Sequence, residues 1–279
     1  AAALARALER VEADLQRQAA KGRISGSAVR AIRERITTTT SLGDLAAADF
    51  VIEAAPEDLE LKRQLFERLD RLCRPEVVLA TNTSSLSVTQ IGAAALRPGR
   101  VVGMHFFNPV PAMQLVEVVA GDASGEAALQ ATEALAEALG KRPVRVRDTP
   151  GFVVNRVARP FSGEALRLLG ERVAAPAQID RIARLACGFR MGPFELMDLV
   201  GLDISLAVHR SVYEQFFGAP RFRPHPLQER MVKAGRLGRK TGQGWYRYQD
   251  GRAVDGPAPA QHARVPGPRV PEVRRVVVL

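Results

Sequence analysis

The stretch Arg100–Val119, RVVGMHFFNPVPAMQLVEVV, reads as two short apolar strands joined by a proline-rich turn. The first strand is apolar apart from His105, and the second is apolar apart from Glu117. Pro109 and Pro111 interrupt the strand pattern, because a proline fixes its own φ and has no backbone N–H to donate. Residue 111 is midway between His105 and Glu117, so a chain that folds back there brings the imidazole and the carboxylate side by side.

A carboxylate beside a histidine fixes the tautomer of the ring and raises the basicity of its other nitrogen. His105 is therefore a candidate general base, and Glu117 is its candidate orienting partner. The alternative is a hydrogen-bonded core histidine, which is the commoner role for a histidine in an apolar strand. A facing glutamate favours the catalytic interpretation, because carboxylates are seldom buried unless they are paired.

Helical and strand patterns alternate on both sides of this hairpin. This alternation predicts an α/β fold with a Rossmann-type, doubly wound and mostly parallel sheet. The predicted helices are at residues 1–21, 27–35, 59–73, 88–95 and 126–139, and the further strands are at 50–52, 77–80 and 143–146.

Polar side chains follow three successive strands of the predicted sheet. In open parallel sheets, ligands bind at the carboxyl ends of the strands. A helix cap explains a single serine or threonine, but it does not readily explain polar residues after three strands. The residues are Glu53 and Glu57, then Asn82 to Ser85, then His105 and Asn108.

The pattern changes at residues 148–152, DTPGF, after which strand signals stop. We expect an all-helical domain over residues 148–248, with helices at 151–169, 177–186, 191–198, 202–217 and 226–234. The glycine-rich stretch 235–248 follows no strand, so it reads as a packed connector rather than a phosphate loop. Residues 249–279 are rich in proline, valine and arginine and are expected to be a disordered tail or a linker.

Composition bounds the class of protein. The 279 residues, 46% of them apolar, are enough for one large or two ordinary globular domains. The net charge is +10, but the arginines are scattered along helices and no nucleic-acid motif occurs, so we expect no nucleic-acid partner. No apolar run is long enough to cross a membrane, and no signal peptide is recognisable.

The two cysteines, Cys73 and Cys187, are far apart in the sequence and lie in predicted helices. Their spacing fits neither a disulfide framework nor a metal site, so we expect two small buried side chains and no metal. These features together predict a reducing, cytoplasmic compartment.

Seven motifs in residues 1–248 resemble the NAD-dependent L-3-hydroxyacyl-CoA dehydrogenases, and they occur in the order found in that family. The resemblance implies an NAD-binding Rossmann-type domain over residues 1–147 and a helical domain over 148–248 that also forms a homodimer interface. The motifs are VIEAAPED (51–58), ATNTSSLSV (80–88), GMHFFNPVP (103–111), LVEVV (115–119), DTPGFVVNR (148–156), GPFELMDLVGLD (192–203) and GRKTGQGWYRY (238–248).

The resemblance also implies an activity, the oxidation of the 3-hydroxyl of an L-3-hydroxyacyl-CoA to a ketone, with hydride transfer to NAD. In this scheme His105 accepts the hydroxyl proton, and Glu117 orients His105 and stabilises its charged form. The implied substrate contacts are Ser84, Asn155 and Asn108, and the positions that contact NAD in the family are occupied here by Ala54, Glu57, Lys62 and Asn82.

Several of these residues have a simpler interpretation. Ser84 could serve only as a helix cap, and Asn155 only as a polar residue of a helix. Lys62 could be a solvated helix position, which makes it the weakest of the cofactor set. Asp198 and Glu195 resemble an acid/base pair, but we interpret them as helix caps and domain packing.

The sequence departs from the family in one respect. The family begins with a strand and a GxGxxG turn that binds the pyrophosphate, and this sequence contains no such motif. It starts in the helix that normally follows these elements, which predicts an N-terminal truncation, with the first strand, the glycine loop and the second strand missing. Such a truncation exposes a sheet edge and weakens NAD binding.

Other functions stay open at this point. A relative that keeps the catalytic pair could act on a non-CoA hydroxy acid, or the chain could be a non-catalytic remnant of the fold. A nucleic-acid binder is the weakest alternative, since only the charge suggests it. The acyl chain is also open, because residues 220–232, PRFRPHPLQERMV, resemble members that act on a dicarboxylyl-CoA, and 3-hydroxybutyryl-CoA is an equal candidate.

Overall fold

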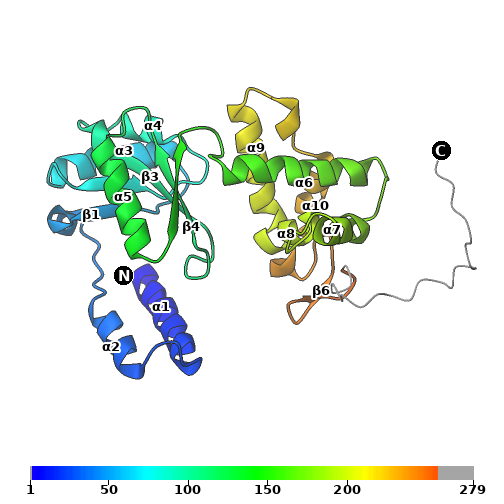
Figure 1. The fold of residues 1–279 in the computed structure, drawn as a ribbon, viewed down its shortest axis with the longest axis horizontal. Coiled ribbons are helices and arrows are strands. Elements are labelled where there is room, and N and C mark those ends of the chain that lie inside the picture. The colour runs from blue at the N-terminus through cyan, green and yellow to red at the C-terminus, as the bar shows by residue number, and fades with distance from the viewer. Residues whose placement is uncertain (1, 257–279) are drawn as a thin grey trace, which may run out of the picture. The chain divides into compact units, whose positions relative to one another are not determined.

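The structure of the chain is a computed structural model that describes residues 2–256 (Figure 1). The chain forms two compact units. The first contains Ala1–Thr83 and Val88–Arg145, and the second contains Ser84–Ser87 and the chain from Val146 onward. The observed change of unit after Arg145 lies close to the predicted change of pattern at residue 148.

A five-stranded sheet organises the first unit, and its strands follow one another in space in their chain order. Strands β1, β2 and β3 are parallel, whereas β4 is antiparallel to β3. This sheet, with helices between its strands, is the Rossmann-like α/β architecture that the sequence predicted. The strands are β1 (Phe50–Glu53), β2 (Val78–Thr81), β3 (Val101–Phe106), β4 (Leu115–Ala120) and β5 (Arg142–Arg147).

The helices of the first unit begin and end close to the predicted positions. Asp58 starts α3 as its N-cap, because its side chain accepts a hydrogen bond of 2.8 Å from the Leu61 N–H. Helix α4 is shorter than predicted, since the chain tightens into i→i−3 turns after Gly92. The helices are α1 (Ala2–Ala20), α2 (Gly26–Glu34), α3 (Leu59–Leu72), α4 (Val88–Gly92) and α5 (Glu126–Ala138), with 3₁₀ segments at Leu42–Ala47 and Pro98–Arg100.

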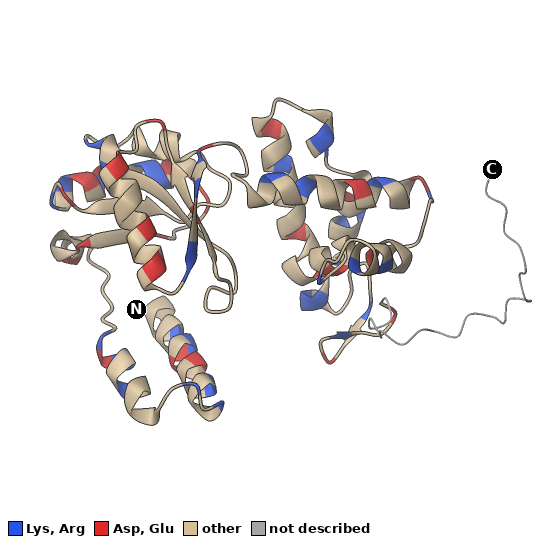
Figure 2. Cartoon of the chain, viewed as in Figure 1, with Lys and Arg blue, Asp and Glu red and all other residues tan. Residues whose placement is uncertain are grey.

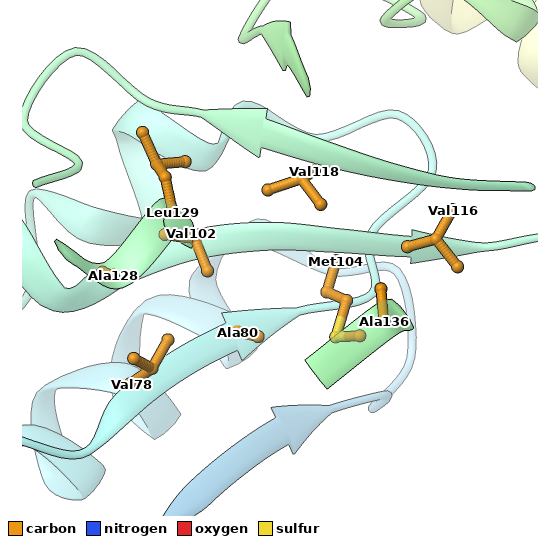
Figure 3. Packing of buried hydrophobic residues seen from close by; sticks show 9 residues of the cluster. All are labelled: Val78, Ala80, Val102, Met104, Val116, Val118, Ala128, Leu129 and Ala136. Atoms are coloured by element: carbon orange, nitrogen blue, oxygen red, sulfur yellow. The ribbon is translucent and has the colours of Figure 1, made fainter. Parts of the chain in front are cut away.

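The core of the first unit lies between the sheet and α5 (Figure 3). Alternate residues of β2, β3 and β4 point to one face of the sheet, because successive side chains of a strand point to opposite faces. Small residues on α5 let this helix pack closely against the strands. The cluster consists of Val78, Ala80, Val102, Met104, Val116, Val118, Ala128, Leu129 and Ala136.

The second unit is built from helices, as the sequence predicted, around a core that includes Phe194, Met197 and Leu202. Helix α6 contains an internal proline, Pro160. The helices are α6 (Val154–Gly170), α7 (Pro176–Leu185), α8 (Pro193–Val200), α9 (Leu202–Gln215) and α10 (Pro226–Lys233), with 3₁₀ segments at Pro220–Phe222 and Arg239–Thr241.

A short β-hairpin corrects the prediction of a tail from residue 249. Strands β6 (Tyr248–Gln249) and β7 (Arg252–Ala253) pair in antiparallel fashion. The connecting residues Asp250 and Gly251 both have positive φ, at 49° and 74°, which is the Asp-Gly signature of a tight hairpin turn. The remainder of the predicted tail, residues 257–279, lies outside the described residues.

The cysteines differ from each other. Cys73 is buried as predicted, but Cys187 is exposed, which corrects the expectation for that residue. Cys187 lies two residues beyond the end of α7 rather than inside the helix.

Basic and acidic side chains are interspersed over the helices of both units (Figure 2), whereas β5 carries three arginines and no acid. Across residues 2–256, no helix combines the length and the apolar character that crossing a bilayer requires. The same residues contain no group of three or more His, Cys, Asp or Glu side chains placed to hold a metal ion.

Candidate active site

His105 and Glu117 face each other across the antiparallel pair β3 and β4, where they are direct partners in the register. Nδ1 of His105 lies 2.7 Å from Oε2 of Glu117, and both side chains are buried. The fold-back that the sequence predicted around residue 111 is therefore confirmed. The proposed roles of the two residues in catalysis stay a prediction.

This geometry defines how the pair can act chemically. When the Glu117 carboxylate accepts a hydrogen bond from Nδ1–H, the neutral ring carries its lone pair on Nε2, where it can accept a proton. The phenyl ring of Phe107 lies 4.5 Å from the imidazole centroid and restricts the ring further. The arrangement suits a general base of fixed orientation.

Asn82 ties the carboxyl ends of three strands together. Its side-chain Oδ1 accepts a hydrogen bond of 2.9 Å from the Phe106 N–H at the end of β3. Its backbone N–H donates to the Glu53 carbonyl, at 2.8 Å, at the end of β1. The predicted cofactor residue Asn82 thus lies at the strand edge where an α/β sheet binds its ligands.

Lys62 forms a buried ion pair with Glu53, which corrects the interpretation of this lysine as a solvated helix residue. Its side chain is 1% exposed, and its Nζ lies 2.7 Å from Glu53 Oε1 and 3.1 Å from the Ala55 carbonyl oxygen. The other carboxylate oxygen of Glu53 accepts a hydrogen bond of 2.7 Å from Thr81 Oγ1. Sequence analysis missed this structural role of Glu53. One signal was available, because Lys62 lies four residues before the apolar Phe66 and therefore on the same face of the helix.

The loop after β1 is held by this ion pair. The Ala55 N–H donates to Glu53, and the Ala55 carbonyl accepts from Lys62, so both backbone groups of Ala55 are engaged. Ala54 and Glu57 are exposed on the same loop, and Glu57 accepts a hydrogen bond of 2.7 Å from Thr83 Oγ1. The structure therefore gathers the four predicted NAD positions at the ends of β1 and β2.

Ser84 and Asn155 lie together in the second unit. Asn155 Nδ2 donates to the Ser84 carbonyl at 3.2 Å, and Gln215 Nε2 donates to the Ser85 carbonyl at 2.8 Å. Ser84 precedes α4 by four residues, so the alternative that it serves only as the cap of this helix is wrong. Asn108 is exposed in the turn after β3, before a cis peptide bond to Pro109.

Asp198 and Glu195 act as capping and packing residues, as predicted. Glu195 accepts from the Gly192 N–H at the start of α8. Asp198 accepts from the backbone N–H groups of Trp245 and Tyr246, at 2.9 and 3.0 Å. The interpretation of residues 235–248 as a packed connector is confirmed.

Close approach to Asp198 explains two glycines of this connector. A Cβ at Gly244 would lie 2.1 Å from Asp198 Oδ1, and a Cβ at Gly238 would lie 2.3 Å from the Asp198 carbonyl oxygen. Both distances are shorter than any contact a side chain allows, so the wrapping of this carboxylate requires glycine.

Asp180 holds the same region from α7. Its carboxylate accepts from the Phe194 and Glu195 N–H groups, each at 2.9 Å, and from the Tyr246 hydroxyl at 2.8 Å. Burial raises the pKa of Asp180 to about 6, although these three hydrogen bonds act in the opposite direction.

Comparison with known proteins identifies both parts of the chain. Residues 1–149 match the family described as 3-hydroxyacyl-CoA dehydrogenase, NAD binding domain, and residues 151–248 match 3-hydroxyacyl-CoA dehydrogenase, C-terminal domain. The chain is 47% identical over 246 residues to the 3-hydroxyadipyl-CoA dehydrogenase of Escherichia coli K12, a match that covers 88% of this chain and 52% of that protein. The chain thus spans about half the length of this relative.

Two further comparisons cover most of this chain and most of the related protein. The probable 3-hydroxybutyryl-CoA dehydrogenase of Bacillus subtilis is 44% identical over 243 residues, which are 87% of this chain and 84% of that protein. The solved structure of (S)-3-hydroxybutyryl-CoA dehydrogenase from Ralstonia eutropha matches with a TM-score of 0.85 and 42% identity, over 89% of this chain and 87% of that chain.

Proposed function

Because this chain belongs to the 3-hydroxyacyl-CoA dehydrogenase family, we propose that it oxidises the 3-hydroxyl group of an L-3-hydroxyacyl-CoA to a ketone. The family consists of NAD-dependent oxidoreductases, and NAD is the cofactor of the domain that residues 1–149 match. The observation that carries the proposal is the buried contact of 2.7 Å between His105 Nδ1 and Glu117 Oε2.

The cofactor site fits the described residues at the ends of β1 and β2. Ala54 and Glu57 are exposed there on a loop whose backbone is fixed by Glu53 and Lys62. Dinucleotides bind outside the carboxyl ends of parallel strands, which is where this loop lies. When bound, NAD supplies the acceptor for the hydride that leaves the substrate carbon.

His105 is proposed as the base. Its Nε2 accepts the proton of the 3-hydroxyl group while the C–H bond of the same carbon breaks, so that the oxygen keeps the electron pair that forms the ketone. Glu117 holds the ring in the tautomer that this step needs and stabilises the positive charge that the ring gains. A positioned base of this kind contributes about 10²–10⁴-fold to a rate.

Ser84, Asn155 and Asn108 are proposed as substrate contacts. The Asn155 side chain donates a hydrogen bond to the backbone carbonyl of Ser84, so the two residues are neighbours in the second unit. Hydrogen bonds to the substrate fix its orientation, and such positioning is a large part of catalysis.

Two acyl classes are candidate substrates. The relatives carry the names 3-hydroxyadipyl-CoA dehydrogenase and 3-hydroxybutyryl-CoA dehydrogenase, so one relative is named for a substrate that ends in a carboxylate and others for one that ends in a methyl group. We further propose that the protein is a cytoplasmic homodimer, as the resemblance implies, and size-exclusion chromatography with light scattering tests the dimer.

The decisive experiment follows the loss of NADH absorbance with acetoacetyl-CoA, the reverse of the proposed reaction. Activity that is lost on omission of the acyl-CoA supports the proposal. A folded protein that oxidises a free hydroxy acid with NAD but ignores every acyl-CoA would contradict it and favour the non-CoA alternative. A folded protein without activity on either class would favour a non-catalytic role.

A further inference from the structure

Among the residues that the structure describes, Arg159 on α6 has no acidic partner. Its Nε is buried and forms no hydrogen bond with any described residue. Its Nη1 makes two long contacts of 3.4 Å, to the carbonyl oxygen and to the hydroxyl of Ser205, and both of these groups are neutral. Across residues 2–256, no Asp or Glu forms an ion pair with this guanidinium.

A second arginine of the same helix shows the usual arrangement. Arg167 is exposed, yet it pairs with Glu164 and with Glu171, the latter at 3.0 Å. Arg159 is less exposed than Arg167 but lacks even one such partner. Buried charges are normally paired, because removing a charge from water is costly without compensation.

Arg159 stays charged, and the groups around it supply no compensating negative charge. Burial lowers the pKa of the Arg159 guanidinium to about 10, which still leaves the group charged at neutral pH. The nearby ring of His209 is uncharged at that pH, because burial, and then the charge of Arg159, lower the pKa of His209 to about 4. The site therefore holds a net positive charge.

The position of Arg159 relates it to the proposed substrate contacts. Residues i and i+4 of a helix are neighbours on one face, about 6 Å apart along the axis, so Arg159 lies one turn beyond Asn155. Asn155 in turn touches Ser84. All three residues belong to the same compact unit.

We propose that Arg159 is a specificity residue that binds the distal carboxylate of a dicarboxylyl-CoA substrate. This inference rests on the proposed function and selects between its two acyl classes. A guanidinium presents two parallel N–H groups to a carboxylate, a match that no methyl group can use. The distal carboxylate of a six-carbon acyl chain lies three carbons beyond the hydroxyl, a separation comparable to one helical turn.

The test compares two substrates of equal length, 3-hydroxyadipyl-CoA and 3-hydroxyhexanoyl-CoA, which differ only in a terminal carboxylate or methyl group. We expect the wild-type protein to have the higher kcat/KM for the carboxylate. Arg159→Met should lower the ratio of the two kcat/KM values by about 10- to 100-fold, the usual range for a hydrogen bond to a charged group. The change should come from the adipyl substrate, mainly through KM.

Two further variants sharpen this test. Arg159→Lys keeps the charge but loses the fork, so its ratio should fall between those of the wild type and Arg159→Met. Arg167→Met removes a charge from the exposed side of the same helix and should leave the ratio unchanged. If Arg159→Met fails to fold, competitive inhibition of the wild type by adipyl-CoA and by hexanoyl-CoA gives the same comparison, and adipyl-CoA should bind more tightly.

Four results would overturn the proposal. One is a wild-type preference for 3-hydroxyhexanoyl-CoA. Another is an Arg159→Met variant with an unchanged ratio, and a change of oligomeric mass in that variant would then assign Arg159 to a carboxylate of a second copy. Activity on neither acyl-CoA overturns the proposed function together with this inference, whereas equal activity on both overturns the inference alone.

Discussion

The two units treat buried charge differently. In the first unit, buried charges meet opposite charges, as Lys62 meets Glu53 at 2.7 Å and Arg100 meets Asp70 at 2.8 Å. In the second unit, the buried carboxylates of Asp180 and Asp198 are held by neutral N–H and hydroxyl donors. An opposite charge favours the ionised form of a buried group. Neutral donors compensate less, so burial can still raise the pKa of the carboxylate.

This difference separates the properties of the two units. Burial raises the pKa of both Asp180 and Asp198, that of Asp180 to about 6, so the stability of the second unit should depend on pH. The first unit should instead be sensitive to mutation of its buried ion pairs. Loss of one partner leaves the other charge buried without compensation, which lowers the stability of the fold. Each of the following experiments addresses one side of this comparison.

Replacement of His105 should have the largest effect. His105→Gln removes the proposed base, and turnover should fall by about 10²–10⁴-fold. The measurement is the steady-state reduction of acetoacetyl-CoA by NADH. Glu117→Gln should lower turnover as well, because a neutral side chain stabilises the charged ring less. Near-normal turnover in His105→Gln would remove the residue from the mechanism.

Replacement of Asp70 should cause the largest loss in the free energy of unfolding of the first unit. Asp70→Ala strands Arg100 in the interior, and breaking a buried pair typically costs about 3–5 kcal/mol. Urea unfolding followed by circular dichroism measures this cost. Asp49→Ala is the matched control, since Asp49 pairs with Arg74 at the surface and should contribute little. Equal destabilisation by both variants would show that burial of the pair is not the deciding factor.

The pH response of the second unit should depend on Asp180. Its folded pKa of about 6 lies above the unfolded value near 3.9, so the folded state favours the protonated form. The resulting stability is present below about pH 4 and is lost as the pH rises through 6, by about 3 kcal/mol. Asp180→Asn, which has no titrating group there, should lack this decline. Parallel pH profiles of the two proteins in urea unfolding would refute the assignment.

Replacement of Glu53 should act on cofactor binding, where we expect the smallest change in function. Glu53→Gln keeps the size of the side chain but removes the charge that holds Lys62 and the loop around Ala55. We expect the Kd of NADH to rise by about 10-fold, the loss of one charge-assisted hydrogen bond, with kcat for the bound complex nearly unchanged. Fluorescence titration with NADH measures this. An unchanged Kd would show that the loop is positioned without the pair.

The sequence predicted the features that depend on local pattern. The facing of His105 and Glu117 followed from a proline-rich turn placed midway between them, and the alternation of helices and strands gave the α/β unit. The hairpin at residues 248–253 carries an equally local Asp-Gly signal, which the proline-rich composition around it obscured.

Other features depend on the tertiary structure. The burial of Lys62 depends on β1, which places Glu53 within reach of α3. Helix periodicity predicts only the face of the helix on which Lys62 lies. The isolation of Arg159 is a property of its whole environment, because it requires that no acid from any element in residues 2–256 reaches the guanidinium. Neither fact can be obtained from spacing in the sequence.

The hydrogen bonds that hold Asp180 and Asp198 have a consequence for synthesis of the chain. Asp180 accepts a hydrogen bond from Tyr246, which is synthesised 66 residues later, and Asp198 accepts one from Trp245, 47 residues later. Contacts of such separation form late, because a long loop must close before they contribute. A ribosome-bound chain that ends before this connector therefore carries two buried carboxylates without these donors, and the helical unit can complete its folding only after residue 246 has emerged.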